Sequence, residues 1–313
     1  MSVRDSPVSK ILVLDNSLEY SRLIRDFCEQ NNLEPLKLRK EVLMSVLRTN
    51  IDLGGILYSE GYADTQAETF RIAAQVHAMR PELPIILRRT SRATLDDLPP
   101  AAQRTFCAAY VASDMDALKA VMTRYIFCLV YPNALLRGIA QITSEVLADE
   151  FPTWTLKQET PFIVHDRIIF GEVMSLIQLE SLWCRGYMML QTEEEALLKL
   201  MGSPATVDRR VHVADVLAEI TNRIWGAFKN RFIGTSRSFD QAQVPLVVNH
   251  KQRYISFGTQ NPQLCFRYTL SNQTHSCTLD ERFIFNLNWT PEDFQEITQD
   301  SVDCVQCGEL QLF

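Results

Sequence analysis

Residues 215–232 read DVLAEITNRIWGAFKNRF, and their polar and apolar side chains repeat with the period of an α-helix. At about 100° per residue, one face carries the polar side chains and a glycine: Asp215, Glu219, Asn222 and Gly226. The opposite face carries Val213, Val216, Leu217, Ile220, Ile224 and Ala227. We therefore predict an amphipathic helix whose carboxylate and amide groups point away from the core. Glu219 and Asn222 are three residues apart, close enough to act together on a phosphoryl group or an attacking water. An ordinary solvated helix face has the same pattern, so the surrounding sequence has to decide between the two interpretations.

The rest of the second half alternates helical and strand patterns. Helical periodicity covers 134–148, 193–201 and 212–230, and strand patterns cover 162–165, 173–181, 184–190, 244–248, 253–257, 264–270 and 282–287. Several strands come in adjacent pairs, which favours a mixed or antiparallel sheet. Thr192 and Glu195 have the spacing of a capping box that would open the middle helix.

The first half has a different organisation. Residues 10–130 alternate short apolar runs with helical patterns, beginning with KILVLDNS and YSRLIRDFCEQNN. Apolar runs without alternation are typical of strands that helices cover on both faces. This order predicts a flavodoxin-like, doubly wound parallel sheet. The fold class is therefore α/β, with one domain at 1–131, a second at 132–313 and a boundary near Tyr131-Pro132.

From Asn133 to about Trp289 the chain resembles the CheC/CheX-type chemotaxis phosphatases, and the CheX branch in particular. Four stretches keep the family's order of elements: NALLRGIAQITSEVLADEF, EVMSLIQLESLWCRGYMMLQTEEEALLKLMG, DVLAEITNRIWGAFKNRF and QVPLVVNHKQRYISF. The third carries the family's Glu-x-x-Asn signature at Glu219 and Asn222. Members of the CheC branch carry a second such signature on the first helix. Here that turn reads Glu145-Val146-Leu147-Ala148, with Ala148 where Asn would stand.

The resemblance implies a phosphatase that hydrolyses the aspartyl phosphate of a separate, CheY-like response-regulator receiver. Asn222 would orient the attacking water, Glu219 would pair with the partner's lysine, and Asp215 would support the helix. An equally good reading has Asp215 only favouring the helix dipole. The protein would need no cofactor of its own, because the partner would bring the phosphoryl group and its Mg²⁺. The resemblance also implies a homodimer.

The first domain resembles a response-regulator receiver that has lost most of its chemistry. Asp15 remains after the first strand, but Asn16 replaces its acidic neighbour and weakens a Mg²⁺ site. The third strand ends at Tyr58 and Ser59 without the acceptor Asp, and Ala112-Ser113-Asp114 stands where Lys-Pro is expected. Thr90 is the candidate for the fourth-strand hydroxyl, beside two unusual arginines. We expect a pseudo-receiver that is not phosphorylated in the usual way. Ser59 or Tyr58 is an alternative acceptor, although buried hydroxyls at strand ends are commoner.

Composition excludes several other classes. The 313-residue chain has a formal net charge of −7 and no sustained basic stripe, which argues against nucleic-acid binding. No apolar run approaches the ~20 residues that span a membrane, so we expect a cytoplasmic protein. Eight scattered cysteines are typical of reduced thiols. Cys304 and Cys307 have the spacing of half of a zinc knuckle, but a structural zinc site needs four ligands. Only the fold could bring Cys265, Cys277 or His275 close enough to supply the others. We therefore predict no metal site.

The leading hypothesis is a CheX-like phosphatase with the pseudo-receiver as a regulatory or targeting module. The alternative is a non-enzymatic signalling adaptor whose CheX-like half only binds receivers or other two-component partners. A third possibility has the pseudo-receiver cover the Glu219 and Asn222 face as an autoinhibitory mimic.

Overall fold

The computed structural model describes residues 7–38, 40–49, 52–165, 168–169, 171–202, 209–234, 244–249, 255–256, 261–287, 291–294 and 296–297. It divides into two compact units. Unit 1 contains Met1–Val130, Thr160–Phe170 and Tyr254–Cys265, and unit 2 contains Tyr131–Glu159, Gly171–Arg253 and Phe266–Phe313. The first division between them falls beside the boundary expected at 131/132. Two segments from the second half of the sequence, however, belong with unit 1.

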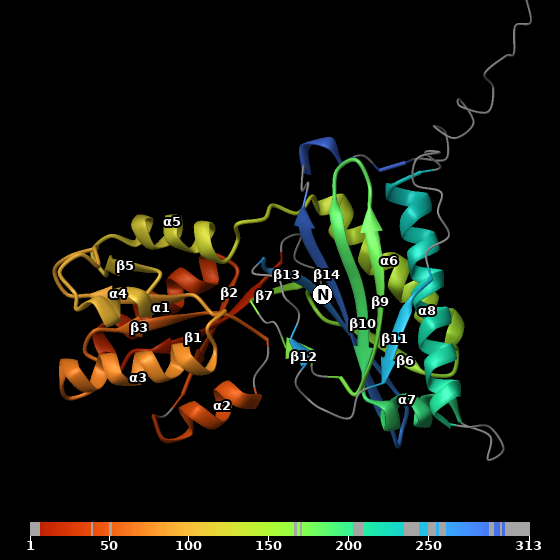
Figure 1. Ribbon diagram of the computed structural model, residues 1–313, viewed down its shortest axis with the longest axis horizontal. Helices are drawn as coiled ribbons and strands as arrows, with labels where there is room; N and C mark the ends of the chain where they lie inside the picture. Colours follow the sequence, from red (N-terminus) through yellow and green to blue (C-terminus); the bar gives the residue numbers. More distant parts are fainter. Residues whose placement is uncertain are drawn as a thin grey trace, which may run out of the picture. The chain divides into compact units, whose positions relative to one another are not determined.

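Unit 1 is built on a five-stranded parallel sheet in the order β2-β1-β3-β4-β5 (Figure 1). Its strands are β1 (Ser9–Leu14), β2 (Leu33–Lys37), β3 (Leu53–Ser59), β4 (Ile85–Arg89) and β5 (Ala108–Val111). Its helices are α1 (Leu18–Gln30), α2 (Leu43–Thr49), α3 (Gln66–Met79), α4 (Pro100–Thr105) and α5 (Met115–Tyr125), with a short 3-10 turn η1 (Lys40–Val42) before α2. This strand order is that of flavodoxin-like folds.

Two apolar clusters cover the two faces of this sheet, because successive residues of β1 point to opposite sides. Leu12 and Leu14 pack with residues of α2, α3 and α4, whereas Ile11 and Val13 pack with residues of α1 and α5. Every residue of β3 is buried, as expected of a central strand between two helical layers.

The later segments of unit 1 hold its first strand through backbone hydrogen bonds. β7 (Phe162–Val164) lies beside Val8, where the Val8 N–H donates to Pro161 O at 2.9 Å and the Ile163 N–H donates to Val8 O at 2.8 Å. The side chains of Val8, Phe162, Val164 and Cys265 form one buried cluster. β8 (Ile168–Ile169) and β12 (Ile255–Ser256) pair as a separate two-stranded ribbon.

Unit 2 contains most of a seven-stranded sheet, ordered β11-β9-β10-β14-β13-β6, with β7 pairing the start of β13. The remaining strands are β6 (Thr155–Gln158), β9 (Val173–Glu180), β10 (Arg185–Thr192), β11 (Leu246–Asn249), β13 (Gln263–Ser271) and β14 (Ser276–Leu287). The pairings of β9 with β10 and β11, of β10 with β14, and of β13 with β6 and β7 are antiparallel. Together with the parallel sheet of unit 1, this sheet confirms the predicted fold class.

Three helices accompany the sheet of unit 2: α6 (Asn133–Glu150), α7 (Glu194–Met201) and α8 (Arg209–Phe232), and a 3-10 turn η3 (Pro291–Asp293) follows β14. Figure 1 shows α6 and α8 along the sheet, and the two helices are in contact. Gly138 allows this approach, because a Cβ atom there would lie only 2.3 Å from Phe232 Cζ. The capping box expected at α7 does not form: Glu193 is the N-cap, and the Thr192 hydroxyl donates to Thr278 O at 2.7 Å.

Candidate functional site

The outer face of α8 carries the candidate catalytic residues. Asp215, Glu219 and Asn222 all lie within the helix and are exposed. In the described part of the chain, the side chains of Glu219 and Asn222 form no hydrogen bond or ion pair. The carboxylate and the carboxamide are therefore both available to a molecule that approaches this face.

The inner face of α8 fixes the helix in the core of unit 2. Phe228 stacks on Phe283 with ring centroids 5.6 Å apart, and Trp225 stacks on Phe228 at 5.9 Å. Thr221 is fully buried and donates its hydroxyl to Leu217 O at 2.7 Å, so no polar group of this residue is left unsatisfied. These contacts hold the helix rigidly and set the direction of its outer row.

Arg223, directly after Asn222, ties α8 to the end of α6. Its Nη1 donates to Glu150 Oε2 at 3.0 Å and its Nη2 to Asp149 Oδ2 at 3.2 Å. Ala148, which stands where a second Glu-x-x-Asn signature would have its Asn, is exposed next to Asp149. The α6 turn therefore offers a methyl group where α8 offers a carboxamide.

One turn beyond Asn222 the helix surface is open. A Cβ atom placed on Gly226 would have no heavy atom within 4 Å apart from its own neighbours in the helix. Space for the backbone of another molecule therefore lies next to Asn222, as expected from the sequence.

In unit 1, an arginine joins two of the residues that the sequence assigns to a degenerate receiver site, Asp15 and Ser59. The Arg88 guanidinium donates from Nε to Asp15 Oδ2 at 2.5 Å and from Nη2 to Asp15 Oδ1 at 3.0 Å. The same Nη2 donates to Ser59 Oγ at 2.9 Å, and the guanidinium lies 4.2 Å from the ring centroid of Tyr20. A fixed positive charge thus stands between the acidic residue and the end of β3.

Electrostatics make this arrangement stable. Burial alone would lower the pKa of the Arg88 side chain, but the hydrogen bond and charge of Asp15 raise it above its ordinary value. Arg88 is 8 % exposed, so the bidentate pair is shielded from water. The Asp15 carboxylate is already neutralised and has little affinity left for a divalent cation.

The other predicted residues of this site are dispersed. Asn16 donates its amide to Tyr62 O at 2.9 Å, and Tyr58 donates its hydroxyl to Thr69 O at 2.7 Å. Burial raises the pKa of the Tyr58 phenol, so the hydroxyl stays protonated. Thr90 and Ser113 are exposed, and the predicted fourth-strand hydroxyl lies just beyond β4.

Arg88 has a role that was not predicted from the sequence. The sequence does indicate that Arg88 and Arg89 need partners. They end a short apolar strand that has to be buried, and a buried charge requires a partner. Arg89 meets this requirement with Asp97, its Nη2 donating to Oδ2 at 2.9 Å. What the sequence could not show is that Asp15, 73 residues earlier, is the partner of Arg88.

Within the described ranges, no three His, Cys, Asp or Glu side chains are grouped so that they could hold a metal ion. Cys304 and Cys307 lie outside the described residues. The described cysteines, including Cys265 and Cys277, form no disulfide with one another. None of the described helices is long and apolar enough to cross a bilayer.

Solved structures of CheC- and CheX-type proteins are similar to this chain. A CheC-like superfamily protein from Shewanella sp. PV-4 is 21% identical, with a TM-score of 0.36 over 47% of this chain and 96% of the other. The chemotaxis protein CheX from Desulfovibrio desulfuricans is 16% identical, with a TM-score of 0.37 over 47% and 97%. A CheX–CheY–BeF3–Mg²⁺ complex from Borrelia burgdorferi is 15% identical, with a TM-score of 0.37 over 48% and 97%. No family model and no curated protein matches the chain.

Proposed function

We propose that unit 2 is a phosphatase that hydrolyses the aspartyl phosphate of a partner response-regulator receiver. The observation that carries the proposal is the outer face of α8, where Glu219 and Asn222 are exposed, lie one turn apart and have no partner among the described residues. The sequence resemblance to the CheX branch supports the choice of substrate class.

The chemistry needs little more than positioning. An acyl phosphate is already activated, so a water placed in line with the phosphorus can attack it directly. The new P–O bond forms to that water, the bond to the aspartyl oxygen breaks, and the products are a free carboxylate and inorganic phosphate. The partner brings the phosphoryl group and the Mg²⁺ that offsets its charge.

Two side chains of this protein have distinct tasks in the proposal. The Asn222 carboxamide holds the attacking water through a hydrogen bond. The Glu219 carboxylate pairs with a lysine of the partner receiver and thereby fixes α8 against the acceptor site. The space beside Gly226 allows the partner's backbone to approach closely.

The test combines Asn222→Ala with the matched control Asn230→Ala, because Asn230 is also exposed on α8 but lies two turns further along. Single-turnover dephosphorylation of a panel of phosphorylated receivers should slow by ~10²-fold or more for Asn222→Ala, as expected for loss of one transition-state hydrogen bond. The control should retain the parent rate. Both variants should keep the parent's unfolding free energy within about 0.5 kcal/mol, since both side chains are exposed.

Glu219→Ala separates binding from chemistry. A salt bridge to the partner acts in the ground state as well as in the transition state, so this change should weaken receiver binding and lower the rate together.

A non-enzymatic adaptor is the competing function. Ala148 on α6 and Arg88 in unit 1 are two positions at which this chain lacks chemistry that related sites would have. If Asn222→Ala is stable and dephosphorylates at the parent rate, or if the parent accelerates no receiver while binding one, the phosphatase proposal is wrong and unit 2 is an adaptor.

A further inference from the structure

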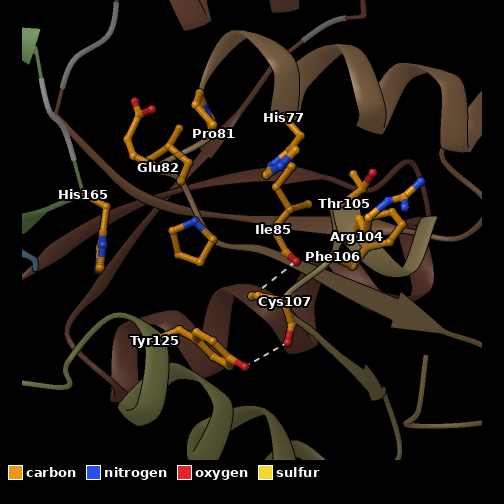
Figure 2. Close-up of a pocket in the computed structure, with 12 residues that line it drawn as sticks. His77, Pro81, Glu82, Ile85, Arg104, Thr105, Phe106, Cys107, Tyr125 and His165 are labelled. Atoms are coloured by element: carbon orange, nitrogen blue, oxygen red, sulfur yellow. Dashed lines mark hydrogen bonds between the residues drawn. The ribbon is translucent and has the colours of Figure 1, made fainter. Parts of the chain in front are cut away.

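Unit 1 contains a cavity of about 360 Å³ at the amino ends of β4 and β5 (Figure 2). Three polar groups in its lining bond to backbone carbonyl oxygens of unit 1. The Tyr125 hydroxyl donates to Cys107 O at 2.9 Å, and the Cys107 thiol donates to Ile85 O at 3.4 Å, as the dashed lines show. The Thr105 hydroxyl donates to Ala101 O at 3.0 Å. These groups therefore support the fold of unit 1 and are not free to bind a ligand.

Glu219 on α8, by contrast, has no partner among the described residues, although a cation stands one turn away. Arg223 follows Glu219 by four residues on the same helix. Side chains at this spacing are neighbours on the helix surface, and an acidic residue four positions before a basic one is the favourable order. α7 shows the pairing that results, because Lys199 Nζ lies 2.9 Å from Glu195 Oε1 at the same spacing. An Arg223 side chain without other partners is therefore expected to pair with Glu219.

Arg223 extends toward α6 instead. Its Nη1 donates to Glu150 Oε2 at 3.0 Å and its Nη2 to Asp149 Oδ2 at 3.2 Å. Both hydrogen bonds join charged groups, which makes them stronger than neutral ones. Two carboxylates of α6 thus hold one guanidinium, whereas Glu219 could offer only one carboxylate to it.

The stability of α6 itself does not explain these two acidic residues. Asp149 and Glu150 are the last two residues of α6, and the last turn of this helix contains no basic residue. The carbonyl end of a helix carries a partial negative charge, so carboxylates are unfavourable there. The Asp149 side chain is 72 % exposed and fills no space in the core. The interaction that the two carboxylates do make is the one with Arg223.

We infer that Asp149 and Glu150 are positioning residues that hold Arg223 away from Glu219. They keep the Glu219 carboxylate unpaired, so that it can bind the lysine of the partner receiver. Neither residue touches the phosphoryl group or the attacking water, and both act through Arg223. The inference rests on the proposed function, because an unpaired Glu219 matters only to a partner that binds it.

The first experiment measures the binding of a beryllofluoride-activated receiver to the full chain and to its variants. Asp149→Asn combined with Glu150→Gln removes both charges and keeps the shape of both side chains. The released Arg223 should then pair with Glu219 for about two-thirds of the time, which weakens receiver binding by about threefold. Adding Arg223→Gln removes the competitor and should restore the affinity to within about 1.5-fold of the parent. Arg223→Gln by itself should bind as the parent does.

Arg223→Gln distinguishes the inference from two simpler roles of this arginine. If Arg223 only ties α8 to α6, Arg223→Gln by itself weakens binding, and adding it to the double variant restores nothing. If Arg223 only repels a basic partner, Arg223→Gln improves binding by the same factor in the parent and in the double variant. Either result overturns the inference.

Glu145→Gln is the matched control for the loss of negative charge from α6. Glu145 is exposed on the same helix, and it accepts a hydrogen bond from the uncharged amide of Gln141 at 2.8 Å. Its removal releases no arginine, so adding Arg223→Gln to Glu145→Gln should leave receiver binding unchanged. Recovery of affinity in this background as well would overturn the inference.

The second experiment needs no receiver and follows the Nε–H signal of Arg223 by NMR in the full chain labelled with ¹⁵N-arginine. The signal is assigned by its loss in Arg223→Gln. In the parent, Glu219→Gln should leave it within its line width. In the Asp149→Asn, Glu150→Gln variant, Glu219→Gln should move it clearly, because the new pair with Glu219 is lost.

The two experiments separate the inference from the proposed function. An Arg223 signal that does not respond to Glu219→Gln in the double variant overturns the inference, even when the parent dephosphorylates a receiver. A parent that neither binds nor dephosphorylates any receiver refutes the proposed function, and the Arg223 signal still decides whether Asp149 and Glu150 hold the arginine away from Glu219.

Discussion

Glu281 in β14 is fully buried and should make the stability of unit 2 depend on pH. Both of its carboxyl oxygens face Thr143 Oγ1, at 3.0 and 2.9 Å, and Tyr268 donates its hydroxyl to Oε2 at 3.3 Å. Burial raises the pKa of Glu281 from 4.5 to about 8, although the hydrogen bonds from Thr143 and Tyr268 lower it in part. The folded protein therefore keeps this carboxyl protonated at neutral pH.

The direction in which the stability of unit 2 changes with pH follows from proton binding. Between about pH 4.5 and pH 8 the folded state holds a proton that the unfolded state has released, so the contribution of Glu281 is fully present below pH 4.5 and is lost as the pH rises. At roughly 1.4 kcal/mol per pKa unit, the loss amounts to about 5 kcal/mol by pH 8 and does not grow further above it.

Glu281→Gln removes the titrating group and keeps a side chain of similar shape. Relative to the parent, this variant should gain stability steadily from pH 5 to pH 8. Trp154, Trp183 and Trp225 belong to unit 2, and the segments of unit 1 contain no tryptophan, so tryptophan fluorescence during urea unfolding follows unit 2 selectively.

Glu180→Gln is the matched control, because Glu180 lies at the end of β9 and is only half-buried. This variant makes the same carboxyl-to-amide change at a site that lacks the full burial of Glu281. A difference between Glu281→Gln and the parent that does not change from pH 5 to pH 8 would refute the reasoning and show that Glu281 is ionised in the folded state.

Three further predictions concern unit 1 and assembly. Acetyl phosphate with Mg²⁺ should leave the intact mass unchanged, because Arg88 neutralises Asp15 and no Asp ends β3; a stoichiometric, hydroxylamine-sensitive adduct would contradict this. Arg88→Met should destabilise unit 1 by about 3–5 kcal/mol in chemical unfolding, since it leaves the buried Asp15 charge unpaired, and adding Asp15→Asn should restore part of that loss; no recovery would argue against the pair. Light scattering at micromolar concentration should give a dimer of 35.9 kDa chains, because β11 is an edge strand with Leu246 exposed, whereas a monomer mass would count against it.

The sequence predicted those features that depend on local periodicity. The outward row of Asp215, Glu219 and Asn222 follows from the 3.6-residue repeat of α8, and the parallel sheet of unit 1 follows from short apolar runs between helical patterns. Their proposed roles on a partner receiver stay predictions.

Features that depend on contacts between residues far apart in the chain could not be predicted from the sequence. β6 was not predicted as a strand, because it lacks an apolar run. Its residues alternate between exposed and half-buried, as they can on an edge strand. Thr192 satisfied the local rule for a capping box, yet its hydroxyl bonds to Thr278, 86 residues away.

The discontinuous composition of unit 1 has a consequence for its synthesis. Val8 leaves the ribosome early, but Phe162, Val164 and Cys265, with which it forms a buried cluster, are made much later. Cys265 follows Val8 by 257 residues, so at ~5–20 residues per second the two are made ~10–50 s apart. Until residues 161–164 have been made, the nascent flavodoxin-like sheet lacks the segment whose backbone bonds to Val8. Unit 1 therefore completes its fold only after residues 131–159 and 171–253 of unit 2 have been translated.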